Sequence, residues 1–164
     1  MALRHIVYEG DEILTKKCRP VENFDRKLTE LLKDMKETMI HNQGIGLAAP
    51  QVGMLKRVCV IGPFEEDDYY EMVNPVIVSS EGEQEGYEGC LSVPGYVGCV
   101  KRPEKVVIKA QDRNGEEVEF TLEGFPAVAA CHEIDHLDGI LYTSKATDIH
   151  KPEDRPEDYE DPEE

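Results

Sequence analysis

The sequence feature that most constrains this chain is the run Cys131–Gly139, in which two histidines lie four residues apart. On a helix, His132 and His136 project from one face, one turn apart, so their imidazoles can bind one divalent metal ion. Glu133 then lies beside the first histidine, where its carboxylate can act as a base toward a metal-bound water. The chain has only five histidines among 164 residues, and this pattern rarely arises by chance. The run therefore predicts a helix that carries a metal site.

The charge of the chain limits its partners. The formal net charge is −17, and residues 148–164 contribute nine acidic side chains against Lys151 and Arg155. The same seventeen residues include three prolines and few apolar side chains. We therefore expect one folded catalytic domain over residues 1–147 and an acidic, proline-rich, disordered tail over residues 148–164. Nucleic acid is not an expected partner, because so acidic a chain would be repelled by phosphate backbones.

The cysteines and the N-terminal sequence indicate the compartment. The chain has five cysteines, and no Cys-x-x-Cys pair occurs among them. No apolar run of signal-peptide length follows the first residues, and no segment approaches the roughly eighteen apolar residues of a membrane span. We expect free thiols in a cytoplasmic protein that does not use a membrane as a partner.

Residue periodicity predicts the fold class. Apolar residues at helical spacing predict a helix from a cap at Asn23 or Asp25 to about His41. A hairpin is predicted over 105–122 around an Asn-Gly turn, and the last helix begins near Phe125. Further strands are expected at 57–61, 69–73 and 76–79, the last two being separated by Asn-Pro. The prediction is an α+β fold, with mostly antiparallel strands packed around a C-terminal metal-binding helix, plus an N-terminal helix.

A catalytic site of this kind needs a third protein ligand and an open coordination position. Tyr142 stands where one branch of the His-Glu-x-x-His peptidases has its third histidine. The chain beyond His150 is too short and acidic to supply a glutamate from a supporting helix, so the third ligand must lie upstream. Cys90 and Cys131 both remain candidates, although Cys131 points away from the histidine face of the helix. A thiolate with two imidazoles suits zinc or ferrous iron.

Three stretches of the sequence resemble the signature motifs of peptide deformylase, in the order and at the separations usual for that family. They are Gly44–Gln51 (GIGLAAPQ), Glu88–Ser92 (EGCLS) and His132–Leu137 (HEIDHL). The resemblance runs from the N-terminus to about residue 147. It implies a bacterial-type enzyme that removes the formyl group from the N-terminal formylmethionine of newly made polypeptides.

The resemblance also implies a role for individual residues. Cys90, His132 and His136 would bind the metal, and Glu133 would be the general acid and base. The side-chain amide of Gln51 and the backbone N–H of Leu91 would form the oxyanion site. The substrate backbone would add as a strand along one set of residues, and the methionine side chain of the substrate would enter a pocket formed by a second set. These sets are Ile45, Gly46 and Gly89 for the backbone, and Glu88, Phe125, Val128, Ala129 and His132 for the side chain.

The identity of the metal and the partners follow from the same resemblance. It implies one divalent ion, Fe²⁺ in the cell, while Zn²⁺, Ni²⁺ or Co²⁺ also suit the ligand set. Cys131 stands where the family commonly has glutamine, which alters the surroundings of the first histidine, and we expect activity to survive. Some members dock on the ribosome through a basic C-terminal helix. The acidic tail of this chain replaces that helix, so a transient ribosome contact would need another docking mode.

Two other functions fit the His-Glu-x-x-His pattern. A zinc endopeptidase would cleave internal peptide bonds, but its usual third histidine or glutamate is missing. A purely structural metal site would be closed by a fourth protein ligand, for which Cys131 and Cys99 are the candidates. Cleavage of internal bonds would favour the first alternative, and coordination by two sulfur atoms would favour the second.

Overall fold

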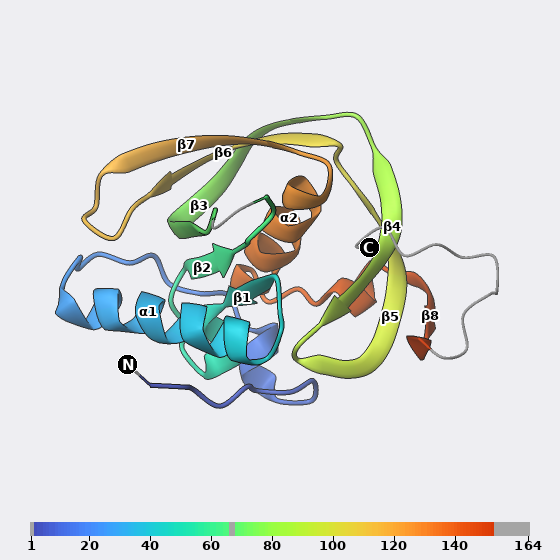
Figure 1. Ribbon diagram of the computed structural model, residues 1–164, viewed down its shortest axis with the longest axis horizontal. Coiled ribbons are helices and arrows are strands. Elements are labelled where there is room, and N and C mark those ends of the chain that lie inside the picture. The colour runs from blue at the N-terminus through green and yellow to red at the C-terminus, as the bar shows by residue number, and fades with distance from the viewer. Residues whose placement is uncertain (1, 66–67, 153–164) are drawn as a thin grey trace.

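The computed structural model describes residues 2–65 and 68–152, which form two α-helices, three short 3-10 helices and two sheets (Figure 1). The helices are α1 (Arg26–His41) and α2 (Phe125–Leu137). The strands are β1 (Gly46–Ala48), β2 (Val58–Ile61), β3 (Tyr70–Glu81), β4 (Gln84–Cys90), β5 (Val93–Arg102), β6 (Lys105–Gln111), β7 (Glu117–Glu123) and β8 (Thr147–His150). One sheet has the order β1-β2-β3-β6-β7 and the other β4-β5-β8, with antiparallel neighbours throughout. The predicted α+β fold is confirmed.

Helix α1 begins where the sequence predicts it. The Asp25 side chain accepts a hydrogen bond from the Leu28 backbone N–H at 3.1 Å, which caps the first turn. Its apolar stripe is buried against β1 and β2, because residues three and four apart share one face of a helix. The stripe consists of Leu28, Leu31, Leu32, Met35 and Met39.

Strand β2 is buried on both faces because a helix covers each face. Val58 and Val60 pack into the cluster that contains α1, whereas Cys59 and Ile61 pack into the cluster that contains α2. This alternation is the period of two expected for a strand. Figure 1 shows α2 at the centre of the molecule, below the ribbon formed by β3, β6 and β7 and beside β4 and β5. Both sheets therefore converge on the helix that carries the two histidines.

The structure corrects the expected break at Asn74. The two predicted strands form one strand, β3, which changes register between Val73 and Val76. Asn74 has a positive φ of 52°, and its side chain accepts a hydrogen bond from the Val21 backbone N–H at 2.7 Å. The Asn-Pro pair is thus accommodated as a bulge rather than as a strand end.

The C-terminal part of the described chain includes a strand that the sequence does not predict. Residues 147–150 form β8, which pairs with β5 at Val97 and Cys99. This strand spans the expected boundary between domain and tail at residue 147. The rest of the expected tail, residues 153–164, lies outside the described residues.

All five cysteines are free thiols, as predicted. In the described part of the chain, neither α1 nor α2 combines the length and the apolar character that crossing a membrane requires.

Candidate active site

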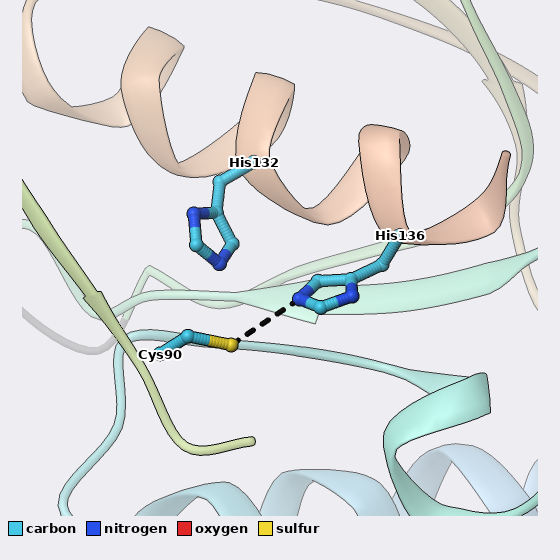
Figure 2. Close-up of side chains that lie close together, drawn as sticks. All are labelled: Cys90, His132 and His136. Atoms are coloured by element: carbon cyan, nitrogen blue, oxygen red, sulfur yellow. Dashed lines mark hydrogen bonds between the residues drawn. The ribbon is translucent and has the colours of Figure 1, made fainter. Parts of the chain in front are cut away.

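The structure brings one thiol and two imidazoles together at the end of β4. Cys90 is the last residue of β4, and His132 and His136 project towards it from successive turns of α2 (Figure 2). Their ligand atoms all lie within 4.8 Å of one another, and Cys90 Sγ is 3.3 Å from His136 Nε2. Ligand atoms of a tetrahedral zinc-type site lie about 3.3–3.6 Å apart, given its metal–ligand bond lengths. The three side chains therefore fit one divalent metal ion.

The cluster leaves room for a further ligand that is not a protein group. Within residues 2–65 and 68–152, no fourth histidine, cysteine, aspartate or glutamate joins it. A site closed by four protein ligands would be typical of a structural metal, whereas three ligands and an open position are typical of a catalytic one. The geometry therefore favours the catalytic type.

His132 is oriented by Glu88 at the end of the ring that faces away from Cys90. His132 Nδ1 lies 2.8 Å from Glu88 Oε1, so Nε2 is left to face the cluster. Burial opposes protonation of His132, but the adjacent Glu133, Cys90 and Glu88 outweigh burial and raise its pKa. For His136, burial and the neighbouring His132 together hold the pKa well below the usual value. A carboxylate contact like the one between Glu88 and His132 fixes the ring orientation of a metal-binding histidine.

Glu88 belongs to a buried ionic network that joins β4, β5 and α2. Arg102 donates two hydrogen bonds to the Glu88 carboxylate, each 2.9 Å long, and a third of 2.7 Å to Asp135. Lys145 Nζ lies 3.0 Å from the same Asp135 carboxylate. Burial would raise the pKa of Glu88, but Arg102 and His132 hold it below its usual value. No sequence motif predicts Arg102 or Lys145, because each reaches its partners only through strand pairing and helix packing.

Glu133 is a buried carboxyl group without a complete set of partners. It is 4 % exposed, and its Oε1 makes no hydrogen bond to any described residue. Burial raises its pKa to about 7, His132 opposes that shift, and Glu88 adds to it. Gly46 lies against the Glu133 carboxyl group, and a Cβ atom at Gly46 would come within 2.8 Å of the carboxyl carbon. Gly46 thus leaves space for a carboxyl group that can exchange a proton near neutral pH.

Gln51 is held beside the cluster by hydrogen bonds at both ends of its amide. Its Oε1 accepts from the Ala48 backbone N–H at 3.0 Å. Its Nε2 donates to Ser92 Oγ at 3.1 Å and lies 3.5 Å from Cys90 Sγ. An amide N–H donor is thereby fixed next to the candidate metal ligands.

A cavity of about 290 Å³ contains these groups. It lies between α2 and two edge strands, β1 of one sheet and β4 of the other. All the residues to which the family resemblance gave a role line it except His136; they are Ile45, Gly46, Gln51, Glu88, Gly89, Cys90, Leu91, Phe125, Val128, Ala129, His132 and Glu133. The sequence analysis assigned no role to four other lining residues: Gly44, which is the first residue of the first motif, Gln43, which precedes it, Tyr87, which precedes the second motif, and Val97, for which the sequence contains no signal.

The sequence is similar to known proteins along almost its whole described length. The family model described as polypeptide deformylase matches residues 3–152. The chain belongs to the peptide deformylase family. The peptide deformylase of Caldicellulosiruptor bescii is 57 % identical over 145 residues, which are 88 % of this chain and 86 % of that protein. Peptide deformylase 2 of Clostridium acetobutylicum is 52 % identical over 92 % of this chain and 100 % of its own length. The chain is therefore a hydrolase of this family.

Solved structures of peptide deformylases have the same fold. The Legionella pneumophila enzyme superposes with a TM-score of 0.86 at 47 % identity, covering 90 % of this chain and 88 % of its own. An actinonin-bound structure from Acinetobacter baumannii gives 0.84 at 36 % identity, covering 90 % of this chain and 100 % of that one. The resemblance inferred from the three motifs is confirmed.

Cys131 is the other cysteine that the sequence left as a candidate metal ligand. Its side chain is buried in the core between α2 and the five-stranded sheet. Burial raises the pKa of its thiol to about 11, so it remains protonated at neutral pH. Among the described residues, the cluster of potential ligand atoms contains Cys90 and not Cys131, so the geometry favours Cys90 as the sulfur donor.

Proposed function

We propose that this chain removes the formyl group from the N-terminal formylmethionine of newly made polypeptides, with one divalent metal ion held by Cys90, His132 and His136. The observation that carries the proposal is the open cluster of three ligands beside the unpartnered carboxyl of Glu133, in one cavity of a peptide deformylase fold. When bound, the ion supplies Lewis acidity and lowers the pKa of water.

Glu133 acts as the general acid and base. Its carboxylate takes a proton from the attacking water, and its carboxyl group then delivers that proton to the departing amine nitrogen. The formyl C–N bond breaks, and the products are formate and a peptide with a free amino terminus. A pKa raised to about 7 suits both directions of transfer near neutral pH.

Gln51 and Leu91 stabilise the oxygen of the formyl group as it gains negative charge. The Gln51 amide donates one hydrogen bond, and the Leu91 backbone N–H donates the other. Support comes from the fixed amide of Gln51 and from the place of Leu91 immediately after Cys90 in the cavity wall.

The substrate adds as a strand between the two sheets. Its backbone pairs with Ile45 and Gly46 on one side and Gly89 on the other, since β1 and β4 are both edge strands. The methionine side chain enters the part of the cavity that adjoins α2. The side-chain pocket is formed by Glu88, Phe125, Val128, Ala129 and His132.

The proposed substrate sets the place of action and the metal. Nascent chains are made in the cytoplasm, where the five free thiols also remain reduced, so we place the enzyme there with Fe²⁺ as its metal. A transient contact with the ribosome would have to use a surface other than a basic C-terminal helix. By likeness to the actinonin-bound relative, actinonin is proposed to occupy the same cavity.

The test is hydrolysis of formyl-Met-Ala-Ser by protein prepared without oxygen and loaded with ferrous iron. We expect formate and free amine in equal amounts, inhibition by actinonin, and near-total loss of turnover in Glu133→Ala. The exposed Glu119→Ala serves as the matched control and should retain full activity.

Either of two results would refute the proposal. One is the absence of turnover with iron, nickel, cobalt or zinc despite one bound metal per chain. The other is cleavage of internal bonds in an unformylated protein such as casein, which would indicate an endopeptidase instead. An X-ray absorption spectrum with two sulfur ligands would favour a closed structural site.

A further inference from the structure

Ser92 is a buried polar residue to which the proposed mechanism gives no role. It follows Leu91 in the turn between β4 and β5, and it is completely inaccessible to solvent. It does not line the cavity that contains Gln51, Cys90 and Glu133. Any effect of Ser92 on the reaction must therefore act through another residue.

The partner of Ser92 is the amide of Gln51, and the orientation of that amide is fixed by its surroundings. The Ala48 backbone N–H lies 3.0 Å from one end of the amide, and of the two ends of an amide only the oxygen can accept a hydrogen bond. That end is therefore Oε1, so Nε2 is the atom that lies 3.1 Å from Ser92 Oγ. Because Nε2 carries two hydrogens, Ser92 accepts one and leaves the other for the cavity.

The hydrogen left for the cavity has only a weak partner in the structure. Nε2 lies 3.5 Å from Cys90 Sγ, and sulfur is a poor hydrogen-bond acceptor. A carbonyl oxygen that gains charge would be a much stronger acceptor at that position. The bond to Ser92 is therefore retained while the other hydrogen changes partner.

The backbones of both residues are held by one neighbouring segment. The Val7 N–H donates to the Gln51 carbonyl at 2.7 Å, and the Glu9 N–H donates to the Ser92 carbonyl at 2.8 Å. Residues 7–9 thus link the 3-10 helix Ala49–Val52, which contains Gln51, to the turn of Ser92, although Gln51 and Ser92 are 41 positions apart in the sequence. The distance between the hydroxyl and the amide is set by the fold rather than by free rotation of the two side chains.

We propose that Ser92 is a positioning residue for deformylation: its hydroxyl accepts one Gln51 amide hydrogen and so aims the other at the formyl oxygen. The inference rests on the proposed function. The terminal torsion of a glutamine is broad, so an amide anchored only through its oxygen would sample orientations that miss the substrate. A donor fixed in advance stabilises the transition state without reorganisation during the reaction.

The first test compares Ser92→Ala with the parent, using the metal-loaded enzyme and formyl-Met-Ala-Ser. We expect kcat to fall by about tenfold, less than the roughly 10²–10³-fold effect of deleting an oxyanion donor outright. KM, bound metal per chain and the unfolding temperature should stay close to the parent values, because alanine removes only one oxygen. The exposed Ser80→Ala is the control and should leave kcat unchanged.

The deciding test is a double-mutant cycle with Gln51→Ala. If Ser92 acts through Gln51, adding Ser92→Ala to Gln51→Ala should change kcat by less than twofold. Equal losses of kcat in the parent and in the Gln51→Ala background would overturn the inference. A Ser92→Ala variant that misfolds would also lose activity equally in both backgrounds. An active parent with an unimpaired Ser92→Ala variant would also overturn it while leaving the proposed function intact. A parent that is inactive with every metal would instead refute the proposed function.

Discussion

Burial of Glu133 works against the stability of the folded chain. A carboxyl group with an unpartnered oxygen inside a protein favours its neutral form, because water no longer solvates the charge. At pH values below the pKa of an unfolded glutamate, about 4.3, Glu133 is protonated in both the folded and the unfolded state. No charge is then buried, and the ionisation of Glu133 does not lower the stability of the folded state. As the pH rises from there to the folded pKa of about 7, the unfolded state ionises while the buried group keeps its proton, and stability is lost.

Glu133→Gln is therefore expected to stabilise the metal-free protein in a pH-dependent way. The gain should be about 1 kcal/mol at pH 5 and reach about 3–4 kcal/mol at pH 8, because an amide cannot ionise. Urea unfolding of metal-free parent and variant at the two pH values measures it, with the exposed Glu119→Gln as control. An equal gain at both pH values would mean that packing, not charge, causes the difference.

Arg102→Met is expected to weaken both the fold and the metal site. It would leave the carboxylates of Glu88 and Asp135 without their shared guanidinium, which typically costs about 3–5 kcal/mol. Loss of the Glu88 anchor should also lower metal affinity roughly 10–100-fold, since His132 would lose its fixed orientation. Denaturant unfolding and competition with a metal chelator measure the two effects.

The matched control for that change is Arg26→Met, which removes an exposed pair with Glu30 on α1. Such a pair contributes about 0.3–0.5 kcal/mol and has no path to the metal site. Unchanged metal affinity in Arg102→Met would contradict the assigned role of the buried network.

At the scale of elements, the N-terminal segment connects parts that the sequence keeps far apart. Ala2 and Arg4 bind the Asp34 side chain of α1, and Arg4 also donates its backbone N–H to Thr38. Further along, Val7 and Glu9 bind the loops of Gln51 and Ser92. The segment therefore ties α1 to both loops that provide the proposed oxyanion donors.

Val7→Pro should loosen the loop of Gln51, because proline has no N–H to donate to the Gln51 carbonyl. We expect kcat to fall several-fold with little change in KM, measured by steady-state kinetics. Leu3→Pro is the control in the same segment, since the Leu3 side chain is exposed and its N–H donates no hydrogen bond within the described chain. Equal effects of the two changes would indicate general damage to the segment.

Local signals predicted the elements that depend on local interactions. The cap at Asp25 and the Asn-Gly turn satisfy backbone groups within a few residues, and Pro126 removes an N–H that would have no partner in the first helical turn. Helix α1, the β6–β7 hairpin and α2 therefore appear as expected. Strand β5 was not predicted, because Pro94 and two glycines interrupt its alternation and pairing with β4 and β8 stabilises it. The two histidines came from motif spacing and Cys90 from the family resemblance. The link through Arg102 has no local sequence signal, and the partner of Ser92, which lies inside a motif, depends on distant pairing.

At the scale of the whole molecule, the site lies where two sheets and a helix meet. All the cavity-lining residues fall between Gln43 and Glu133. We propose that the tail beyond Pro152 is dispensable for catalysis, whereas β8 is needed for the three-stranded sheet. His150 supports this distinction, since it pairs with Val97 of β5 and its ring contacts Tyr87.

Two truncations separate these contributions. A chain that ends at residue 152 should keep its unfolding temperature and its kcat/KM for formyl-Met-Ala-Ser. A chain that ends at residue 146 loses β8, exposes one edge of β5 and should unfold at a lower temperature. Calorimetry and the formate assay provide the comparison, and equal stability of the two chains would argue against a structural role for β8.

The proposed metal ligands are widely separated in the sequence, since Cys90 and His136 are 46 residues apart and the histidines come last. Ribosomes make a chain from its N-terminus, so an unfinished copy contains the cysteine before either imidazole. The metal centre can form only after α2 has left the exit tunnel, when most of the molecule has been made. An unfinished copy therefore lacks the complete set of proposed metal ligands, and the proposed activity requires a nearly finished molecule.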